Sequence, residues 1–345
     1  MTPPIDVDLY SDTITRPTPA MRRAMAEAEV GDEQLLEDPT VNALQQRVAE
    51  LLGKEAALFL PSGTMANQVS IRVHTRPGDE LLAHRTAHPI HFEVGGIAAL
   101  AGVQVRPLDG PRGQYDAATA EAAIRPGWRE MPRSRLLWVE QTSNLGGGSI
   151  WPLERVREVT DLARRGGLAT HLDGARLLNA VVASGVAARD WAAPFDSAWI
   201  DFSKGLGAPI GSCLAGSAAF IDEAWRLKQQ MGGAMRQAGI IAAAALYALD
   251  HHVDRLADDH ANARRLANGL ADLPGVRLEL DHVETNIVLI ELTGSLDAAT
   301  AMDELRRRGV RMVDLGPRTL RAVTHLDVDA AGIDRAIDVA RQVFV

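Results

Sequence analysis

Short apolar runs alternate with segments of helical periodicity along most of this chain, and this alternation constrains the fold more than any other feature. Val41, Leu44 and Val48, for example, recur at helical spacing. Asp38 precedes them as a capping residue, and Gly53 follows as a helix end. Strands are predicted at residues 56–60, 103–108, 136–139, 168–172, 197–202 and 212–215. Near-continuous apolar strands between helices predict an α/β fold, with a mainly parallel sheet covered on both faces.

The pattern changes after about residue 240. An alanine-rich and then charged stretch, residues 240–273, predicts one long helix. A strand at 286–292, a helix from about residue 296 and a closing strand and helix follow it. With 345 residues, the chain is long enough for two domains. We therefore predict an N-terminal segment and large domain over residues 1–245, and a small α+β domain over residues 246–345.

Charge and cysteine content exclude several classes of function. The 36 basic and 45 acidic residues give a net charge of −9, which disfavours nucleic acid or an anionic membrane as the main partner. A single cysteine, Cys213, excludes a disulfide framework and a cysteine-rich metal site. No apolar run reaches ~18 residues, and the first residues do not resemble a signal segment. These features predict a cytoplasmic protein that uses no metal.

Polar residues follow four of the predicted strands, where ligands bind in open α/β sheets. They are Ser62-Gly63-Thr64, residues 140–144 (EQTSN), residues 173–176 (DGAR) and Ser203-Lys204-Gly205. Because these positions lie at one edge of the sheet, we expect them to form one crevice. The first group opens a helix, so it either caps that helix or holds a phosphate at its positive end.

Lysine is rare in this chain, so few residues can supply an amine to a reaction that needs one. The chain has only Lys54, Lys204 and Lys228, and we expect the first and last to be ordinary surface charges. Lys204 instead leaves a buried strand. Asp173, at a neighbouring strand end, could be a helix cap, a metal ligand or the partner of a ring nitrogen. A lysine, an acid and a phosphate site together match the needs of pyridoxal phosphate.

Seven motifs spread along the chain carry a family resemblance. They are residues 8–17 (DLYSDTITRP), 38–42 (DPTVN), 62–67 (SGTMAN), 171–176 (HLDGAR), 203–209 (SKGLGAP), 235–239 (MRQAG) and 323–327 (VTHLD). In these motifs the chain resembles the low-specificity threonine aldolases, pyridoxal-phosphate enzymes of fold type I. The resemblance implies an aspartate-aminotransferase-like large domain with a mainly parallel seven-stranded sheet.

The resemblance also implies how the cofactor would be held. Lys204 would bind it covalently, Asp173 would pair with its ring nitrogen, and His88 would stack on the ring. A histidine alone identifies nothing, so a structural role for His88 is the alternative. The phosphate would be held by Gly63 and Thr64, with Arg236 near the same site, in this subunit or from a neighbouring one.

For the substrate, the resemblance implies a β-hydroxy-L-amino acid that is cleaved to glycine and an aldehyde. Ser11, Arg176 and Arg321 would bind its α-carboxylate, and Arg176 would also contact the cofactor. The family likeness further implies a homotetramer, a dimer of dimers with active sites at the dimer interface. β-Elimination, racemisation and a catalytically silent cofactor-binding relative are the alternatives.

Three positions depart from the family pattern. Ser143 stands where the family motif ENTHN has its histidine, and Leu35 stands where the family has a tyrosine. A family lysine before the glycine cluster corresponds to Gln229. Ser143 and Leu35 would make the wall around the substrate less polar, which predicts a preference for bulkier or aryl β-substituents.

Overall fold

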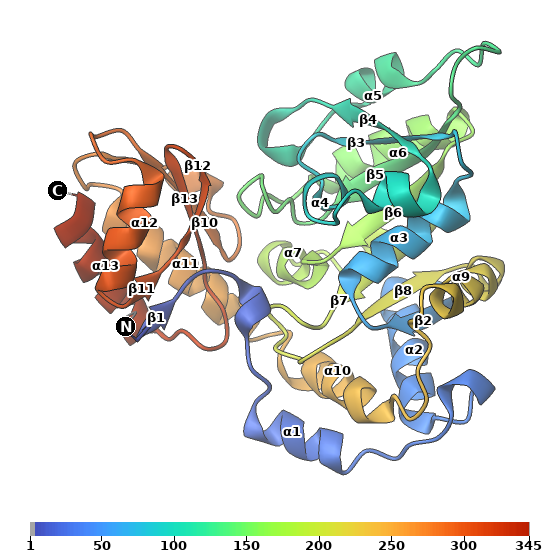
Figure 1. Cartoon of the computed structure of the whole chain (residues 1–345), viewed down its shortest axis with the longest axis horizontal. Coiled ribbons are helices and arrows are strands. Elements are labelled where there is room, and N and C mark those ends of the chain that lie inside the picture. The colour runs from blue at the N-terminus through green and yellow to red at the C-terminus, as the bar shows by residue number, and fades with distance from the viewer. Residues whose placement is uncertain (1–3, 345) are drawn as a thin grey trace.

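A seven-stranded sheet forms the centre of the larger lobe in the computed structural model, which describes residues 4–344 (Figure 1). Its strand order is β2-β8-β7-β6-β5-β3-β4, and all of these strands run in the same direction except β8, which pairs antiparallel with β2 and β7. The strands are β2 (Ala56–Leu60), β3 (Glu80–His84), β4 (Gln104–Leu108), β5 (Ser134–Glu140), β6 (Ala169–Gly174), β7 (Ser197–Asp201) and β8 (Ser212–Gly216). The sheet is therefore mainly parallel, as predicted.

Strand β3 was not predicted from the sequence. Its first residue, Glu80, is a fully buried acid that interrupts the apolar pattern. Arg125 compensates the buried charge with an ion pair of 3.0 Å between Nη2 and Oε1. Because this arginine lies far from β3 in the sequence, no local pattern indicates the pairing.

Helices cover both faces of the sheet, and the side chains of one strand alternate between two cores. Leu137 and Val139 of β5 belong to one core, which includes residues of α6 (Leu153–Arg165), whereas Leu136 and Trp138 belong to another, which includes residues of α3 (Gly63–His74) and η3 (Ile97–Ala101). The helical segments of the larger lobe are η1 (Asp12–Ile14), α1 (Pro19–Ala26), η2 (Glu33–Leu35), α2 (Pro39–Leu52), α3 (Gly63–His74), α4 (His88–His91), η3 (Ile97–Ala101), η4 (Pro111–Gly113), α5 (Ala117–Ala123), α6 (Leu153–Arg165), α7 (Leu177–Ser184), α8 (Ala188–Ala192), α9 (Ala218–Gln230) and α10 (Gly239–His251).

The smaller lobe is built on an antiparallel sheet of order β12-β13-β10-β9 with its own core. It comprises α11 (Leu256–Leu270), β9 (Val276–Arg277), η5 (Leu280–His282), β10 (Ile287–Leu292), α12 (Ala298–Arg307), β11 (Val310–Arg311), β12 (Val313–Gly316), β13 (Thr319–Val323) and α13 (Ala330–Phe344). Near the N-terminus, β1 (Val7–Asp8) joins this lobe by pairing in parallel with β11 (Figure 1). The domain boundary after residue 245 falls inside α10 and stays a prediction.

The prediction of one long helix over residues 240–273 is wrong. The structure has two helices, α10 and α11, separated by residues 252–255. His252 Nδ1 lies 2.7 Å from the carbonyl oxygen of Leu206, and Arg255 contacts the Gly205 carbonyl at 3.4 Å. These contacts hold the turn between the two helices against the loop that follows Lys204. The turn was not predictable from the sequence, because apolar residues have helical spacing on both sides of it. Within residues 4–344, no helix is long and apolar enough to span a membrane.

Candidate active site

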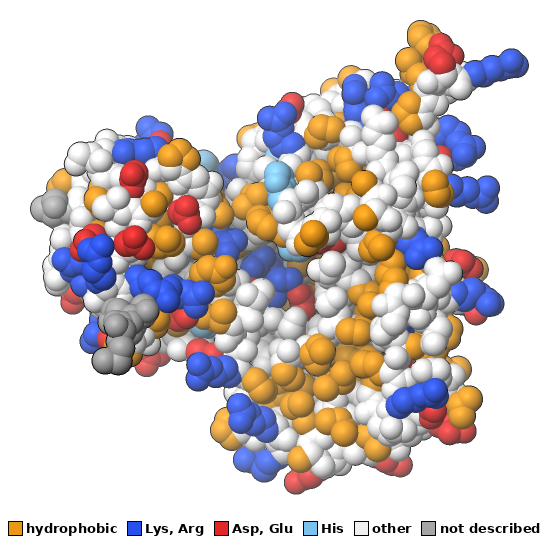
Figure 2. All heavy atoms as spheres, viewed as in Figure 1, with side chains coloured by type: hydrophobic (Ala, Val, Ile, Leu, Met, Phe, Trp, Pro, Cys, Tyr) orange, Lys and Arg blue, Asp and Glu red, His pale blue; other side chains and the backbone are white. Residues whose placement is uncertain are grey.

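A cavity of about 330 Å³ lies at the carboxyl ends of β5, β6 and β7, within the usual size range of small-molecule sites. The structure brings to it six of the residues singled out from the sequence. These are Gly63, Thr64, His88, Asp173, Arg176 and Lys204. Figure 2 shows a hollow between the two lobes in which basic and acidic side chains are visible.

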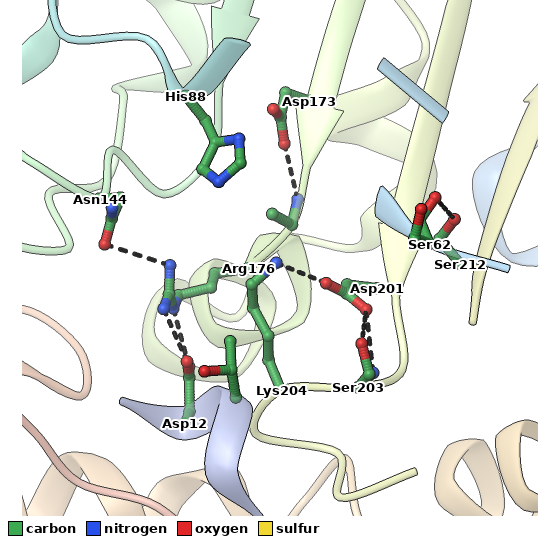
Figure 3. A network of polar contacts seen from close by, with 12 residues as sticks. Asp12, Ser62, His88, Asn144, Asp173, Arg176, Asp201, Ser203, Lys204 and Ser212 are labelled. Carbon is green, nitrogen blue, oxygen red and sulfur yellow. Dashed lines mark hydrogen bonds and ion pairs between the residues drawn. The ribbon is translucent and has the colours of Figure 1, made fainter. Parts of the chain in front are cut away.

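Lys204 enters the cavity from the loop after β7 (Figure 3). Its Nζ forms an ion pair with Asp201 Oδ2, and only 15% of the lysine side chain is exposed. Asp201 is itself held by Ser203, whose backbone N–H and hydroxyl donate to Oδ1 at 2.9 and 2.8 Å. The chain therefore presents one sheltered amine, fixed by a neighbouring carboxylate.

Asp173 is fully buried at the end of β6. Its Oδ1 accepts a hydrogen bond of 3.1 Å from the Ala175 N–H, and its Oδ2 accepts one of 3.1 Å from Asn67 Nδ2. Burial, and then the nearby charge of Glu140, raise the pKa of Asp173 to about 7. A carboxylate in this setting is stabilised by a cationic N–H donor, such as a protonated ring nitrogen.

His88 begins α4 and lines the same cavity. Its Nδ1 lies 2.8 Å from Glu93 Oε1, and its backbone N–H donates to Glu140 Oε2 at 2.8 Å. Burial tends to lower the pKa of His88. The hydrogen bond to Glu93 and the charges of Asp173 and Glu140 outweigh burial, so the pKa is raised.

The turn before α3 is tightly packed around Gly63. Ser62 caps the helix, because its Oγ accepts from the Met65 N–H at 3.1 Å. A Cβ at Gly63 would lie 2.5 Å from Cη2 of Trp199, so only glycine fits without a shift. The first amides of α3 and the Thr64 side chain lie at the cavity wall, where the helix terminus favours an anion.

Two arginines meet at Asn144, and of the two Arg176 lines the cavity. Arg176 donates to both carboxylate oxygens of Asp12, from Nη2 at 2.6 Å and from Nε at 2.8 Å. Asn144 Oδ1 accepts from Arg321 Nη1 at 2.9 Å and from Arg176 Nη1 at 3.4 Å. Burial and the charge of Arg176 lower the pKa of Arg321 to about 10. Two guanidinium groups that share one neutral acceptor form a site suited to a carboxylate.

Ser11 precedes Asp12 and is buried with it. Its Oγ accepts from the Thr13 N–H at 3.2 Å, which caps η1. The N-terminal segment therefore reaches the cavity through Thr13 and Thr15, while Asp12 is buried against Arg176 and Ser11 fixes the local turn.

Five other residues singled out from the sequence do not line this cavity: Ser11, Arg321, Ser143, Leu35 and Arg236. Ser143 is buried against Gly113 and Gly146, because its neighbours Thr142 and Asn144 take the positions that face the cavity. Leu35 is 66% exposed on η2. Arg236 is also exposed, with its Nη1 2.8 Å from Asp32 Oδ2.

The expectation that Lys228 is a surface charge is wrong. Its side chain is fully buried and forms an ion pair with Glu33. Its Nζ also lies 4.9 Å from the centre of the Trp225 ring. Lys54 is partly buried, and its Nζ donates to the carbonyl oxygen of Phe195.

Sequence reasoning assigned no role to several polar residues around the cavity. Asn67 contacts Asp173, Asp201 holds Lys204, and Asp12 pairs with Arg176. Asn67 was detectable in principle, because it lies four residues after Gly63 and therefore on the same face of α3. Asp12 carries no comparable local signal, since its partner Arg176 is 164 residues away in the sequence.

Comparisons with known proteins show the family to which this chain belongs. The sequence model of the beta-eliminating lyase family matches residues 8–293. The chain is 42% identical to the low specificity L-threonine aldolase of Escherichia coli K12, over 93% of this chain and 94% of that one. It is 39% identical to low-specificity L-threonine aldolase 1 of Arabidopsis thaliana, over 97% and 96% of the two chains.

A solved structure, the threonine aldolase of Leishmania major, has the same fold. Its TM-score is 0.83 at 22% identity, and the match covers 98% of this chain and 100% of that one. The predicted fold class, an aspartate-aminotransferase-like fold of type I, is confirmed by this match and by the mostly parallel central sheet.

Proposed function

The chain belongs to the beta-eliminating lyase family, in its threonine aldolase branch, and from this premise we propose that it cleaves β-hydroxy-L-amino acids of the threonine type to glycine and an aldehyde. The observation that carries the proposal is the convergence of Lys204, Asp173, His88 and Arg176 on one cavity. Pyridoxal phosphate and an amino acid substrate require four groups at such a site: an amine, a carboxyl group with a raised pKa, an imidazole ring and a guanidinium group.

The residues around the cavity fit this cofactor. Lys204 would bind its aldehyde carbon, and Asp173 would hold the proton on its ring nitrogen. His88 would lie against its ring, and Gly63 and Thr64 would receive its phosphate. When bound, pyridoxal phosphate withdraws electrons from the substrate Cα, and this makes the bond from Cα to Cβ breakable.

The protein's other groups would orient the substrate. Arg176 and Arg321 would bind its carboxylate, which would replace the Asn144 amide oxygen as their shared acceptor. His88 Nε2, the ring nitrogen not engaged by Glu93, is available to take the proton of the β-hydroxyl. Trp199 and the ordered loop after β7 would keep water from the amine of Lys204.

An assay of products tests the proposal. The purified protein, supplied with pyridoxal phosphate, is expected to release acetaldehyde and glycine from L-threonine or L-allo-threonine. Release of ammonia without aldehyde would instead indicate β-elimination, and inversion at Cα would indicate racemisation. Bound cofactor with no turnover of any of these substrates would indicate a silent relative.

The preference for bulkier or aryl β-substituents stays a prediction. It was based on Ser143 and Leu35, and neither lines the cavity of this chain. A comparison of kcat/KM for threonine, allo-threonine and phenylserine tests it, and a clear preference for either threonine isomer would contradict it.

We also propose a cytoplasmic homotetramer, a dimer of dimers in which Arg236 serves a neighbouring cavity. Val30, Leu35, Leu36 and Ile240 are all at least 40% exposed. Figure 2 shows apolar side chains gathered over the lower part of the larger lobe, where α1 and α10 lie in Figure 1. Light scattering is expected to give four times the mass of one chain. The buried position of Cys213 is compatible with a reducing compartment.

A further inference from the structure

Glu93 is a buried carboxylate that the proposed reaction does not itself use. Its side chain is fully buried. Oε1 accepts hydrogen bonds from His88 Nδ1 at 2.8 Å and Asn67 Nδ2 at 2.7 Å, and Oε2 accepts one from Gln68 Nε2 at 2.6 Å. Among these three partners, only the histidine can carry a positive charge, so the carboxylate and the imidazole are electrostatically matched.

Asn67 links this carboxylate to a second one. Its Nδ2 donates to Glu93 Oε1 and also to Asp173 Oδ2, at 3.1 Å. Both hydrogens of the amide are therefore used between carboxylates. The position of Asp173 depends on Asn67, and the position of Asn67 depends on Glu93.

The local backbone is shaped to aim Glu93 inward. Val94 and Gly95 both have positive φ, +52° and +70°, and Val94 is almost fully exposed. This conformation is costly for a β-branched residue, and strain of this kind concentrates at functional sites. At Gly96, a Cβ would lie 2.7 Å from Cδ of Gln68, so glycine is needed for Gln68 to reach Glu93.

We propose that Glu93 is a positioning residue that orients His88 directly and Asp173 through Asn67, and thereby sets both groups for the proposed aldol cleavage. The catalytic part of this inference rests on the proposed function. The hydrogen bonds that orient His88 and Asn67 do not depend on that function.

The hydrogen bond to Glu93 places a proton on His88 Nδ1 and leaves Nε2 as the nitrogen that faces a ligand. Three carboxylates face this histidine: Glu93, Glu140 at the end of β5 and Asp173 at the end of β6. Glu93 is the only one that contacts the ring itself. A glutamine at position 93 would remove that charge and could present its own N–H to Nδ1, which would reverse the tautomer.

The test compares Glu93→Gln, Glu93→Asp and the wild type. In the cofactor-free proteins, NMR titration of the His88 ring is expected to show a pKa that falls by about 1 unit or more in Glu93→Gln. The aspartate variant keeps the charge, so it is expected to retain most of the raised pKa. An unchanged His88 pKa in Glu93→Gln would overturn the proposal.

Two further measurements separate positioning from simple structural support. Glu93→Gln is expected to bind pyridoxal phosphate more weakly, and to lower kcat about tenfold or more, with the acidic limb of the kcat/KM profile moved to lower pH. Glu121→Gln, the same change at an exposed position, is the control and should match the wild type. The proposal would be contradicted by a fall in kcat that leaves both the acidic limb of the kcat/KM profile and the affinity for the cofactor unchanged. If the wild type releases no aldehyde, the proposed function fails, while the titration still decides the role of Glu93.

Discussion

At the scale of single residues, the environment of Lys204 distinguishes it from the other two lysines. Lys204→Ala is expected to abolish turnover and the borohydride-sensitive attachment of the cofactor, because no other amine within residues 4–344 lines the cavity. Lys54→Ala is the matched control, since Lys54 donates to a carbonyl oxygen elsewhere in the fold. Absorption spectra before and after borohydride would decide. Cofactor still attached in Lys204→Ala would exclude its role.

Substitution of Asp173 tests whether this buried acid binds the cofactor or only stabilises the fold. Asp173→Asn is expected to lower kcat by orders of magnitude while some cofactor remains bound, because an amide fills the position without stabilising a protonated ring nitrogen. Steady-state kinetics and a cofactor titration measure the two effects separately. Turnover near that of the wild type would mean that Asp173 is only a cap for the turn at Ala175.

At this scale, the sequence predicted where functional groups lie along the chain but not always where they point. The predicted strand ends placed Lys204, Asp173 and Arg176 at one edge, and the structure brings them together. Ser143 lies in the loop after β5, at the same edge of the sheet, but its side chain packs against Gly113 and Gly146 instead of lining the cavity. The role of Glu93 was not predictable, because its partners Asn67 and Gln68 lie 26 and 25 residues before it in the sequence.

At the scale of elements, two histidines share one serine near the amino ends of β6 and β7. His74 Nε2 lies 2.6 Å from Ser197 Oγ, and His171 Nδ1 lies 2.7 Å from the same oxygen. Burial lowers the pKa of His74 to about 4, and burial also lowers the pKa of His171 well below its usual range. The His74 imidazole is therefore neutral in the folded protein at pH 5, whereas unfolded histidines take up protons below about pH 6.5.

This pair is expected to make the fold sensitive to acid. Because the folded pKa lies below the unfolded one, stability is complete above pH 6.5 and is lost as the pH falls toward 4. From pH 7.5 to 5, His74 alone should lower the free energy of unfolding by about 2 kcal/mol. Urea unfolding of the cofactor-free wild type and His74→Gln at both pH values measures this loss. Equal losses in the two proteins would show that His74 does not cause it.

Elements were predictable where local pattern and tertiary contacts agree. Helix α2 begins after Asp38 and ends at Gly53, because the Asp38 side chain accepts from the Val41 N–H and Gly53 adopts φ +63°. The turn between α10 and α11 was not predictable, since it depends on contacts with the loop at Gly205 and Leu206. Local sequence signals determine the ends of α2, whereas contacts with residues distant in the sequence determine the turn between α10 and α11.

At the scale of the whole molecule, Asp12 connects the two lobes. It binds Arg176 of the larger lobe, and its Oδ2 accepts from Asn286 Nδ2 of the smaller lobe at 3.1 Å. Although burial alone would raise its pKa, Arg176 lowers that pKa to about 2. The carboxylate is therefore charged at any pH at which the protein is used.

Removal of this carboxylate should affect stability and substrate binding together. Asp12→Ala is expected to lower the free energy of unfolding by about 3–5 kcal/mol, because it leaves Arg176 buried without its partner. It should also raise KM for threonine, since Arg176 would lose its orientation. Asp12→Asn, which keeps an acceptor for Arg176, should show smaller losses in both. Urea unfolding and initial-rate kinetics test this, and an unchanged KM in a folded Asp12→Ala would separate Asp12 from the substrate.

The pairing of β1 with β11 affects the order in which the molecule can be completed. Ribosomes release a chain from its N-terminus at roughly 5–20 residues per second. Val7 emerges before its strand partner Val310 by an interval on the order of tens of seconds. Ser11 and Asp12 follow β1 directly, so the arginine side of the cavity cannot be completed before Val310 has been made. Catalytic competence therefore cannot precede synthesis of the smaller lobe.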